Sequence, residues 1–173
     1  MTTNMFFALT IISLGIILGT VLIISQYKDR KAREEKRVDM SFMEGLNLTG
    51  FPIVSFHNNN RVFNFLLDTG SNVSLINGSV LTDMAYENDT TEIELYGLDG
   101  ISRTGKSVIA FLSYKNVEYK THFLVTDLNP TFMQIKKEHG VQLHGLLGSD
   151  FFKAYKYVLD FDELIAYSKL NNK

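Results

Sequence analysis

Residues 66–71 read Leu-Leu-Asp-Thr-Gly-Ser and close an apolar stretch that begins at Val62. A carboxyl group at the buried end of such a strand costs free energy unless it is paired or hydrogen-bonded. Asp, Thr and Gly are also ordinary turn residues, so the simplest interpretation is an Asp that binds its own backbone at a strand end. Carboxyl groups in this setting also mark functional sites. Both interpretations of Asp68 remain open from these residues alone.

The sequence around this turn alternates with a period of two from about Leu46 onward, which indicates short strands. Asn129 is expected to cap a helix that has Pro130 at its first position and ends at Gly140, and a second helix is expected from Ser149 to Tyr155. The pattern predicts an all-β barrel or sandwich of about eight short strands with one or two short helices. The expected strands are 53–56, 62–67, 91–96, 107–114, 117–125, 157–161 and 164–167.

The N-terminal segment differs from the rest of the chain. Met5–Ser25 is 21 residues without a charge, and a helix needs ~20 apolar residues to cross the hydrocarbon core of a bilayer. We therefore predict a tail and single transmembrane helix over residues 1–27, in contact with lipid through residues 5–25, and a charged linker over 28–45. A buried core helix and a cleaved signal peptide are the alternatives, and both are usually shorter in their apolar part.

The flanks of this segment predict its orientation. Six Lys or Arg residues lie within 28–37, whereas none precedes the apolar segment. The positive-inside rule then places the N-terminus outside and the following domain on the cytoplasmic side of the cell membrane.

Composition excludes several classes of function. The 173 residues contain no Cys, which excludes disulfides, thiolate metal sites and a Cys nucleophile. Residues 38–173 hold 11 basic and 16 acidic side chains, so no nucleic-acid partner is expected. No phosphate-binding glycine motif is present, and His139 and His144 lack the spacing of a ligand set. We expect no metal and no cofactor.

Two further motifs follow the Asp68 turn along the chain. Gly97-Leu98-Asp99-Gly100 suits the tip of a hairpin, and Gly145-Leu146-Leu147-Gly148 precedes the second predicted helix. In this order, with Val158–Phe161 near the end, the motifs resemble the retropepsin family of single-domain aspartic proteases. The resemblance covers about Leu46–Tyr167 and implies a protease domain over 46–170 that folds as a closed barrel. Among members of the family, the membrane-anchored bacterial type looks most similar. An insertion at 129–139 departs from the compact retroviral enzymes.

The resemblance implies a homodimer, because one chain carries a single Asp-Thr-Gly and the reaction needs two facing carboxylates. The two copies would hydrolyse peptide bonds in a peptide or protein substrate. Catalysis is assigned to Asp68, Thr69 and Gly70, and substrate binding to Ser71, Gly97, Leu98, Asp99 and Gly100. The alternative is a catalytically silent, membrane-tethered peptide-binding or dimerisation module of the same fold.

Overall fold

The computed structural model describes residues 15–29, 38–96 and 102–168. The chain divides into two compact units, of which the first holds residues 1–37 and 171–173 and the second holds Val38–Leu170. Residues 15–29 of the first unit are helical. Among the described residues, no helix is long and apolar enough to cross a membrane. Residues 5–14, the first part of the predicted span, lie outside the described residues.

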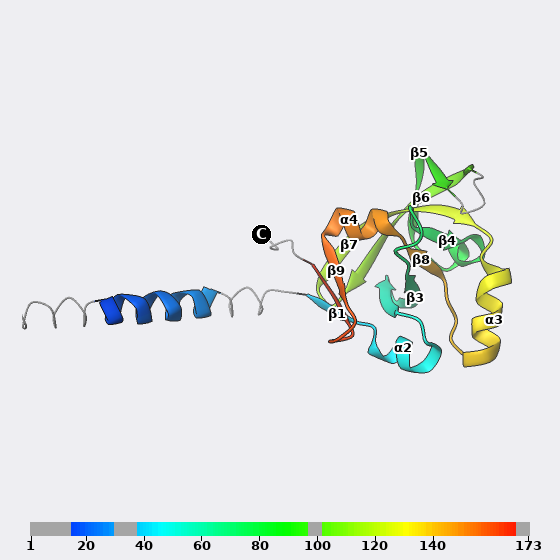
Figure 1. Ribbon diagram of the computed structural model, residues 1–173. Coiled ribbons are helices and arrows are strands. Elements are labelled where there is room, and N and C mark those ends of the chain that lie inside the picture. Colours follow the sequence, from blue (N-terminus) through cyan, green and yellow to red (C-terminus); the bar gives the residue numbers. More distant parts are fainter. Residues whose placement is uncertain (1–14, 30–37, 97–101, 169–173) are drawn as a thin grey trace, which may run out of the picture. The chain divides into compact units, whose positions relative to one another are not determined.

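The second unit is built from short strands and three α-helices within its described residues (Figure 1). In chain order the elements are β1 (Asp39–Ser41), α2 (Met43–Thr49), β2 (Ile53–Asn58), β3 (Arg61–Leu67), β4 (Leu75–Asn77), a 3₁₀ turn (Gly78–Thr82), β5 (Tyr86–Tyr96), β6 (Ser102–Tyr114), β7 (Val117–Thr126), α3 (Asn129–His139), β8 (Gly145–Leu147), α4 (Ser149–Tyr155), β9 (Tyr157–Asp160) and β10 (Ile165–Ser168).

Six of the strands close into a barrel, as the family resemblance implies. Their order is β2-β3-β8-β4-β7-β6, and the pairing of His57 with Ser113 joins β6 back to β2. The pairs β3–β8 and β4–β7 are parallel, whereas the hairpins are antiparallel. Strand β5 pairs with β6 outside the ring, and the β5–β6 hairpin extends beyond the rest of the barrel (Figure 1). A separate sheet has the order β1-β10-β9.

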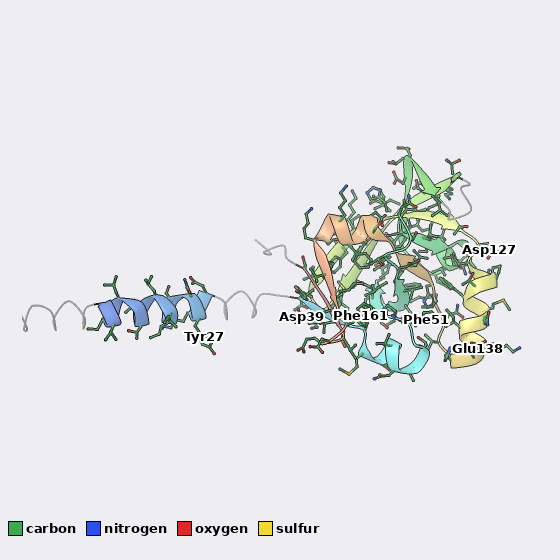
Figure 2. All side chains as sticks on the ribbon, in the orientation of Figure 1. Tyr27, Asp39, Phe51, Asp127, Glu138 and Phe161 are labelled. Atoms are coloured by element: carbon green, nitrogen blue, oxygen red, sulfur yellow. The ribbon has the colours of Figure 1, made fainter. Side chains whose placement is uncertain are left out.

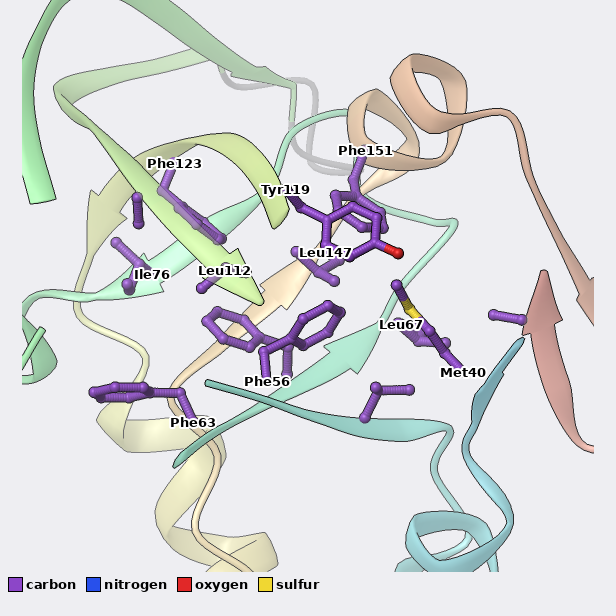
Figure 3. Packing of buried hydrophobic residues seen from close by; sticks show 14 of the residues in the cluster. Met40, Phe56, Phe63, Leu67, Ile76, Leu112, Tyr119, Phe123, Leu147 and Phe151 are labelled. Carbon is purple, nitrogen blue, oxygen red and sulfur yellow. The ribbon is translucent and has the colours of Figure 1, made fainter. Parts of the chain in front are cut away.

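Aromatic side chains fill the barrel (Figure 3). The ring of Phe56 meets those of Phe65, Tyr119 and Phe151 edge to face, an arrangement that aromatic pairs prefer. Phe65 also stacks on Phe123 at a centroid distance of 5.5 Å. Burial of one such side chain contributes about 1.5–3 kcal/mol to folding. This core joins β2, β3, β7 and α4, which carry or support the residues of the candidate site.

Elements of the second compact unit extend into the segment predicted as a linker, 28–45, and a third α-helix accompanies the two predicted ones. Strand β1 and the first three residues of helix α2 fall within that segment, and both elements belong to the second compact unit. Helix α2 was not predicted because its sequence carries no helix signal. Gly45 is an unfavourable residue within a helix, and the residue before the helix, Phe42, provides no side-chain cap. The glycine is required by packing, since a Cβ at Gly45 would lie 2.7 Å from Cβ of Ile53.

Helix α3 confirms the predicted helix at 129–139, and its C-cap is Gly140 with a φ of 73°, as expected. The predicted cap at Asn129 is wrong, because the helix already begins at that residue. Its backbone N–H instead donates to the Asp127 carboxylate at 3.0 Å. Figure 2 shows Asp127 and Glu138 at opposite ends of this helix. The Asn129 side chain accepts a hydrogen bond from Asn77 at 2.8 Å, which fastens α3 to the end of β4.

Candidate active site

Asp68 lies at the carboxyl end of strand β3, directly after the last buried residue, Leu67. Its backbone N–H donates to the carbonyl of Leu147 on the neighbouring parallel strand β8 at 2.9 Å. One carboxylate oxygen, Oδ1, accepts the N–H of Gly70 at 2.9 Å. The turn therefore holds the carboxylate, which is half-buried at the mouth of the barrel, in a fixed orientation.

The loop that carries Asp68, residues 68–74, crosses the end of β8 and connects to β4. A backbone hydrogen bond connects this loop to the start of α4, since the N–H of Ser149 donates to the carbonyl of Ser71 at 2.8 Å. The backbone of Gly148 lies against the loop, and a Cβ at this position would lie 2.4 Å from the carbonyl oxygen of Val73. Only glycine fits at this distance, which explains the glycine at the end of the Gly-Leu-Leu-Gly motif.

Ser74 and Asp150 form a buried clasp between the loop and α4. Ser74 is fully buried, and its hydroxyl donates to Asp150 Oδ1 at 2.8 Å while its N–H donates to Oδ2 at 3.0 Å. The same hydroxyl accepts the N–H of Gly148 at 3.0 Å. Sequence analysis did not identify either residue. Two features of the sequence could have indicated them: a short polar residue directly before the buried strand β4, and an acidic residue in the first turn of helix α4.

A row of leucines lies on the barrel face opposite the aromatic core. Register places Leu66, Leu146, Leu75 and Leu124 beside one another on the four adjacent strands β3, β8, β4 and β7. Val73, Leu95 and Leu128 pack against this leucine row. Alternation along β3 puts Leu66 and Asp68 on the same side. Leu66 is half-buried, whereas Leu75, Leu124 and Leu146 are at most 8% exposed, so the carboxylate borders an apolar surface that neighbouring residues largely cover.

The remaining predicted site residues are only partly described. Thr69 and Gly70 are exposed at the tip of the loop, and Ser71 is half-buried with its hydroxyl bound to the carbonyl of Val73 at 2.7 Å. The predicted hairpin tip, Gly97, Leu98, Asp99 and Gly100, lies outside the described residues. The strands on either side of it are paired as far as Tyr96 and Ser102.

Two other features of the described residues lie away from Asp68. A cavity of about 950 Å³ runs along α3 and is lined by residues such as Phe132, Met133 and Gln142. Within the described part of the chain, no three His, Asp or Glu side chains come together in a way that could hold a metal ion.

Residues 54–151 of the chain match the protein family described as aspartyl protease. The match spans more than half of the 173 residues. The chain belongs to the aspartyl protease family. None of the curated proteins matches it. Membership supports a hydrolase that acts on peptide bonds, and the matched residues contain both the Asp68 turn and the Ser74–Asp150 clasp.

His144, beside the strand that supports the Asp68 loop, makes a hydrogen bond that protonation of its ring would break. Its Nδ1 accepts the backbone N–H of Asn64 at 2.9 Å, which requires that nitrogen to be unprotonated. The ring lies edge-on to Phe63, and burial lowers the pKa of His144 below its ordinary value of 6.5. Since His144 directly precedes β8, its hydrogen bond helps to hold the strand that supports the Asp68 loop.

We expect the folded domain to lose stability as pH falls below about 6.5, because the unfolded chain then binds a proton at His144 that the folded chain excludes. His144→Asn keeps an acceptor near the position of Nδ1 but does not titrate. The difference in unfolding free energy between wild type and this variant should shrink by about 0.5–1 kcal/mol from pH 7 to pH 5, since the partly exposed ring is screened. Urea unfolding of both proteins at pH 7 and pH 5 measures this difference. A difference that stays constant between the two pH values would contradict the proposed role of His144.

Proposed function

We propose that this protein is a membrane-anchored aspartic endopeptidase of the retropepsin type that works as a homodimer. The observation that carries the proposal is the position of Asp68, held by backbone hydrogen bonds at the end of a barrel strand inside a family-matched domain. One chain supplies one such carboxylate. Two copies related by a two-fold axis would bring two Asp68 side chains to the same bond.

The mechanism follows from that pairing. Two adjacent carboxyl groups share one proton, because both cannot ionise at short distance. The ionised Asp68 takes a proton from a water molecule, whose oxygen attacks the peptide carbonyl carbon, while the other Asp68 donates its proton to the carbonyl oxygen. The diol intermediate then breaks its C–N bond: the leaving nitrogen takes a proton from the protonated Asp68, and the other Asp68 takes one from a diol hydroxyl, so the dyad again holds one proton.

The residues around Asp68 receive supporting roles in the proposal. The exposed Thr69 reaches across the dimer axis to the opposite loop. Gly70 leaves space at the carboxylate, since a Cβ there would lie 3.1 Å from Asp68 Oδ1. Ser71 lines the cleft beside the dyad. Gly97, Leu98, Asp99 and Gly100 are proposed to cover an extended peptide and exclude water.

The leucine row supports a preference for apolar side chains next to the cleaved bond. It borders Asp68 on the same face of β3 and is aliphatic throughout. A charged substrate side chain placed there would lose its hydration without gaining a partner. Leucine, methionine or phenylalanine would bury surface instead, at about 25 cal/mol for each Å² removed from water.

The membrane anchor is supported by the uncharged residues 5–25 and by the described helix, on which apolar side chains such as Ile16, Leu22 and Ile23 are more than half exposed. The basic run at 28–37 supports an orientation with the protease domain on the cytoplasmic side. Anchoring in two dimensions raises the effective concentration of the domain and favours its dimer. These features fit the membrane-anchored bacterial type of retropepsin.

Cleavage of a peptide library by the full-length chain, purified in detergent, tests the proposal. Mass spectrometry should find cuts flanked by apolar residues at mildly acidic to neutral pH, and sedimentation in the same buffer should find a dimer. A dimer that binds peptides without cutting them would instead support the silent binding module. A monomer that cuts them would contradict the shared dyad.

A further inference from the structure

The β5–β6 hairpin changes register near its middle. Residues 86–89 pair with 107–110, and residues 93–96 pair with 102–105, so that 90–92 of β5 stand opposite a single residue of β6. An irregularity of this kind bends the strand and redirects whatever lies beyond it. The hairpin therefore has an inner part attached to the barrel and an outer arm, residues 93–96 and 102–105.

Three side-chain contacts hold the bend. Asp89 Oδ1 accepts the N–H of Thr91 at 3.0 Å, and the Ser107 hydroxyl donates to the carbonyl of Thr91 at 2.5 Å. Asp89 Oδ2 also contacts His122 Nδ1 at 2.7 Å. His122 lies on β7, so this last contact crosses β6 and ties the bend to the barrel wall. The His122 side chain remains 47% exposed beside this contact.

Asp89 is well suited to hold the bend. Its side chain is only 6% exposed. The Thr91 N–H and the His122 ring lower the pKa of Asp89 to about 2, so the carboxylate stays ionised. The alternation along β5 and β7 places Glu87 and Lys120 on the same face of the sheet, beside the pair.

The outer arm lies over the leucine row. Leu95 packs against that row, and a Cβ at Gly105 would lie 3.1 Å from Leu124 Cδ1. The arm therefore runs close above the apolar surface that borders Asp68. A small change in the bend would lift Leu95 away from this surface.

We propose that Asp89 and His122 are positioning residues for substrate binding, because their contact across β6 sets the angle at which the outer arm covers the leucine row. This inference rests on the proposed function. The arm contacts the side chains flanking the cleaved bond rather than the bond itself. Loss of the contact should therefore weaken substrate binding more than the chemical step.

Kinetics of the full-length chain on a cleaved library peptide test the inference. We expect Asp89→Ala and His122→Ala each to raise KM about five- to tenfold while kcat changes less than about twofold. His122→Asn, which keeps a donor near the position of Nδ1, should recover most of the loss. Asp83→Ala serves as the matched control, because it removes an exposed ion pair with Arg61 outside the hairpin and should leave KM unchanged.

Hydrogen exchange provides a readout that does not need activity. The backbone amides of 93–96 and 102–105 should exchange faster in Asp89→Ala and His122→Ala than in Asp83→Ala. The inference would be overturned if KM and amide exchange were the same in Asp89→Ala, His122→Ala and the control Asp83→Ala. It would also be overturned if kcat fell by the same factor in all three variants. A wild-type chain that cleaves nothing would refute the proposed function, and exchange would still decide whether the contact holds the arm.

Discussion

Asp68→Asn is expected to abolish peptide cleavage, with a loss of at least about 10³-fold in kcat. An amide neither takes a proton from water nor donates one to a carbonyl oxygen. The fold should survive, because the amide oxygen still accepts the Gly70 N–H that Asp68 Oδ1 accepts now. Thermal unfolding should change by less than about 0.5 kcal/mol, as for ordinary surface substitutions. The matched control is Asp83→Asn, whose carboxylate pairs with Arg61 away from the loop.

Mixing the variant with wild type tests whether two copies share one site. With a ninefold excess of Asp68→Asn and random pairing, only about a tenth of wild-type chains find a wild-type partner. Activity per wild-type chain should fall to about a tenth, and the same excess of Asp83→Asn should leave it unchanged. Activity that stays constant in the mixture would show that a single chain carries the whole site. Equal cleavage by Asp68→Asn alone would identify another nucleophile or a contaminant.

Much of the barrel could be predicted because local and tertiary signals agree along its long strands. The alternation at 117–125 matches β7, and the turn residues Asn59 and Lys115 adopt the positive φ that hairpin turns require. The closed ring could not be derived from any local pattern. It depends on the pairing of His57 with Ser113, which are remote in sequence, and on parallel pairs that only the assembled sheet reveals.

The turn at Asp68–Ser71 could be proposed as catalytic from sequence because its chemistry is concentrated in consecutive residues. The groups that hold the turn were missed because they come from separate parts of the chain. Ser74 reads as one polar residue before a buried strand, and Asp150 as an ordinary acidic residue in the first turn of a helix. Only the fold brings them to hydrogen-bond distance. The same reason explains why the contact between Asp89 and His122 could not be predicted.

Asp150→Asn is expected to lower the free energy of unfolding by about 2–3 kcal/mol, although it changes neither shape nor size. Asp150 Oδ1 accepts the Ser74 hydroxyl and the Phe151 N–H, and Oδ2 accepts the Ser74 N–H. An amide has only one acceptor oxygen. In one orientation its NH₂ group faces the Ser74 N–H, and in the other it faces the Phe151 N–H, so a buried donor always meets a donor.

The control for that substitution is Asp160→Asn. Asp160 accepts the N–H groups of Asp162 and Glu163 through a single oxygen, Oδ1, in an exposed turn. An amide oxygen replaces that acceptor completely, so stability should change by less than about 0.5 kcal/mol. Urea unfolding of both variants measures the difference. Because the clasp holds the loop that carries Asp68, Asp150→Asn should also lower kcat at temperatures where the variant is fully folded. A stable Asp150→Asn variant with unchanged kcat would show that the hydrogen bonds from Ser74 do not position the catalytic loop.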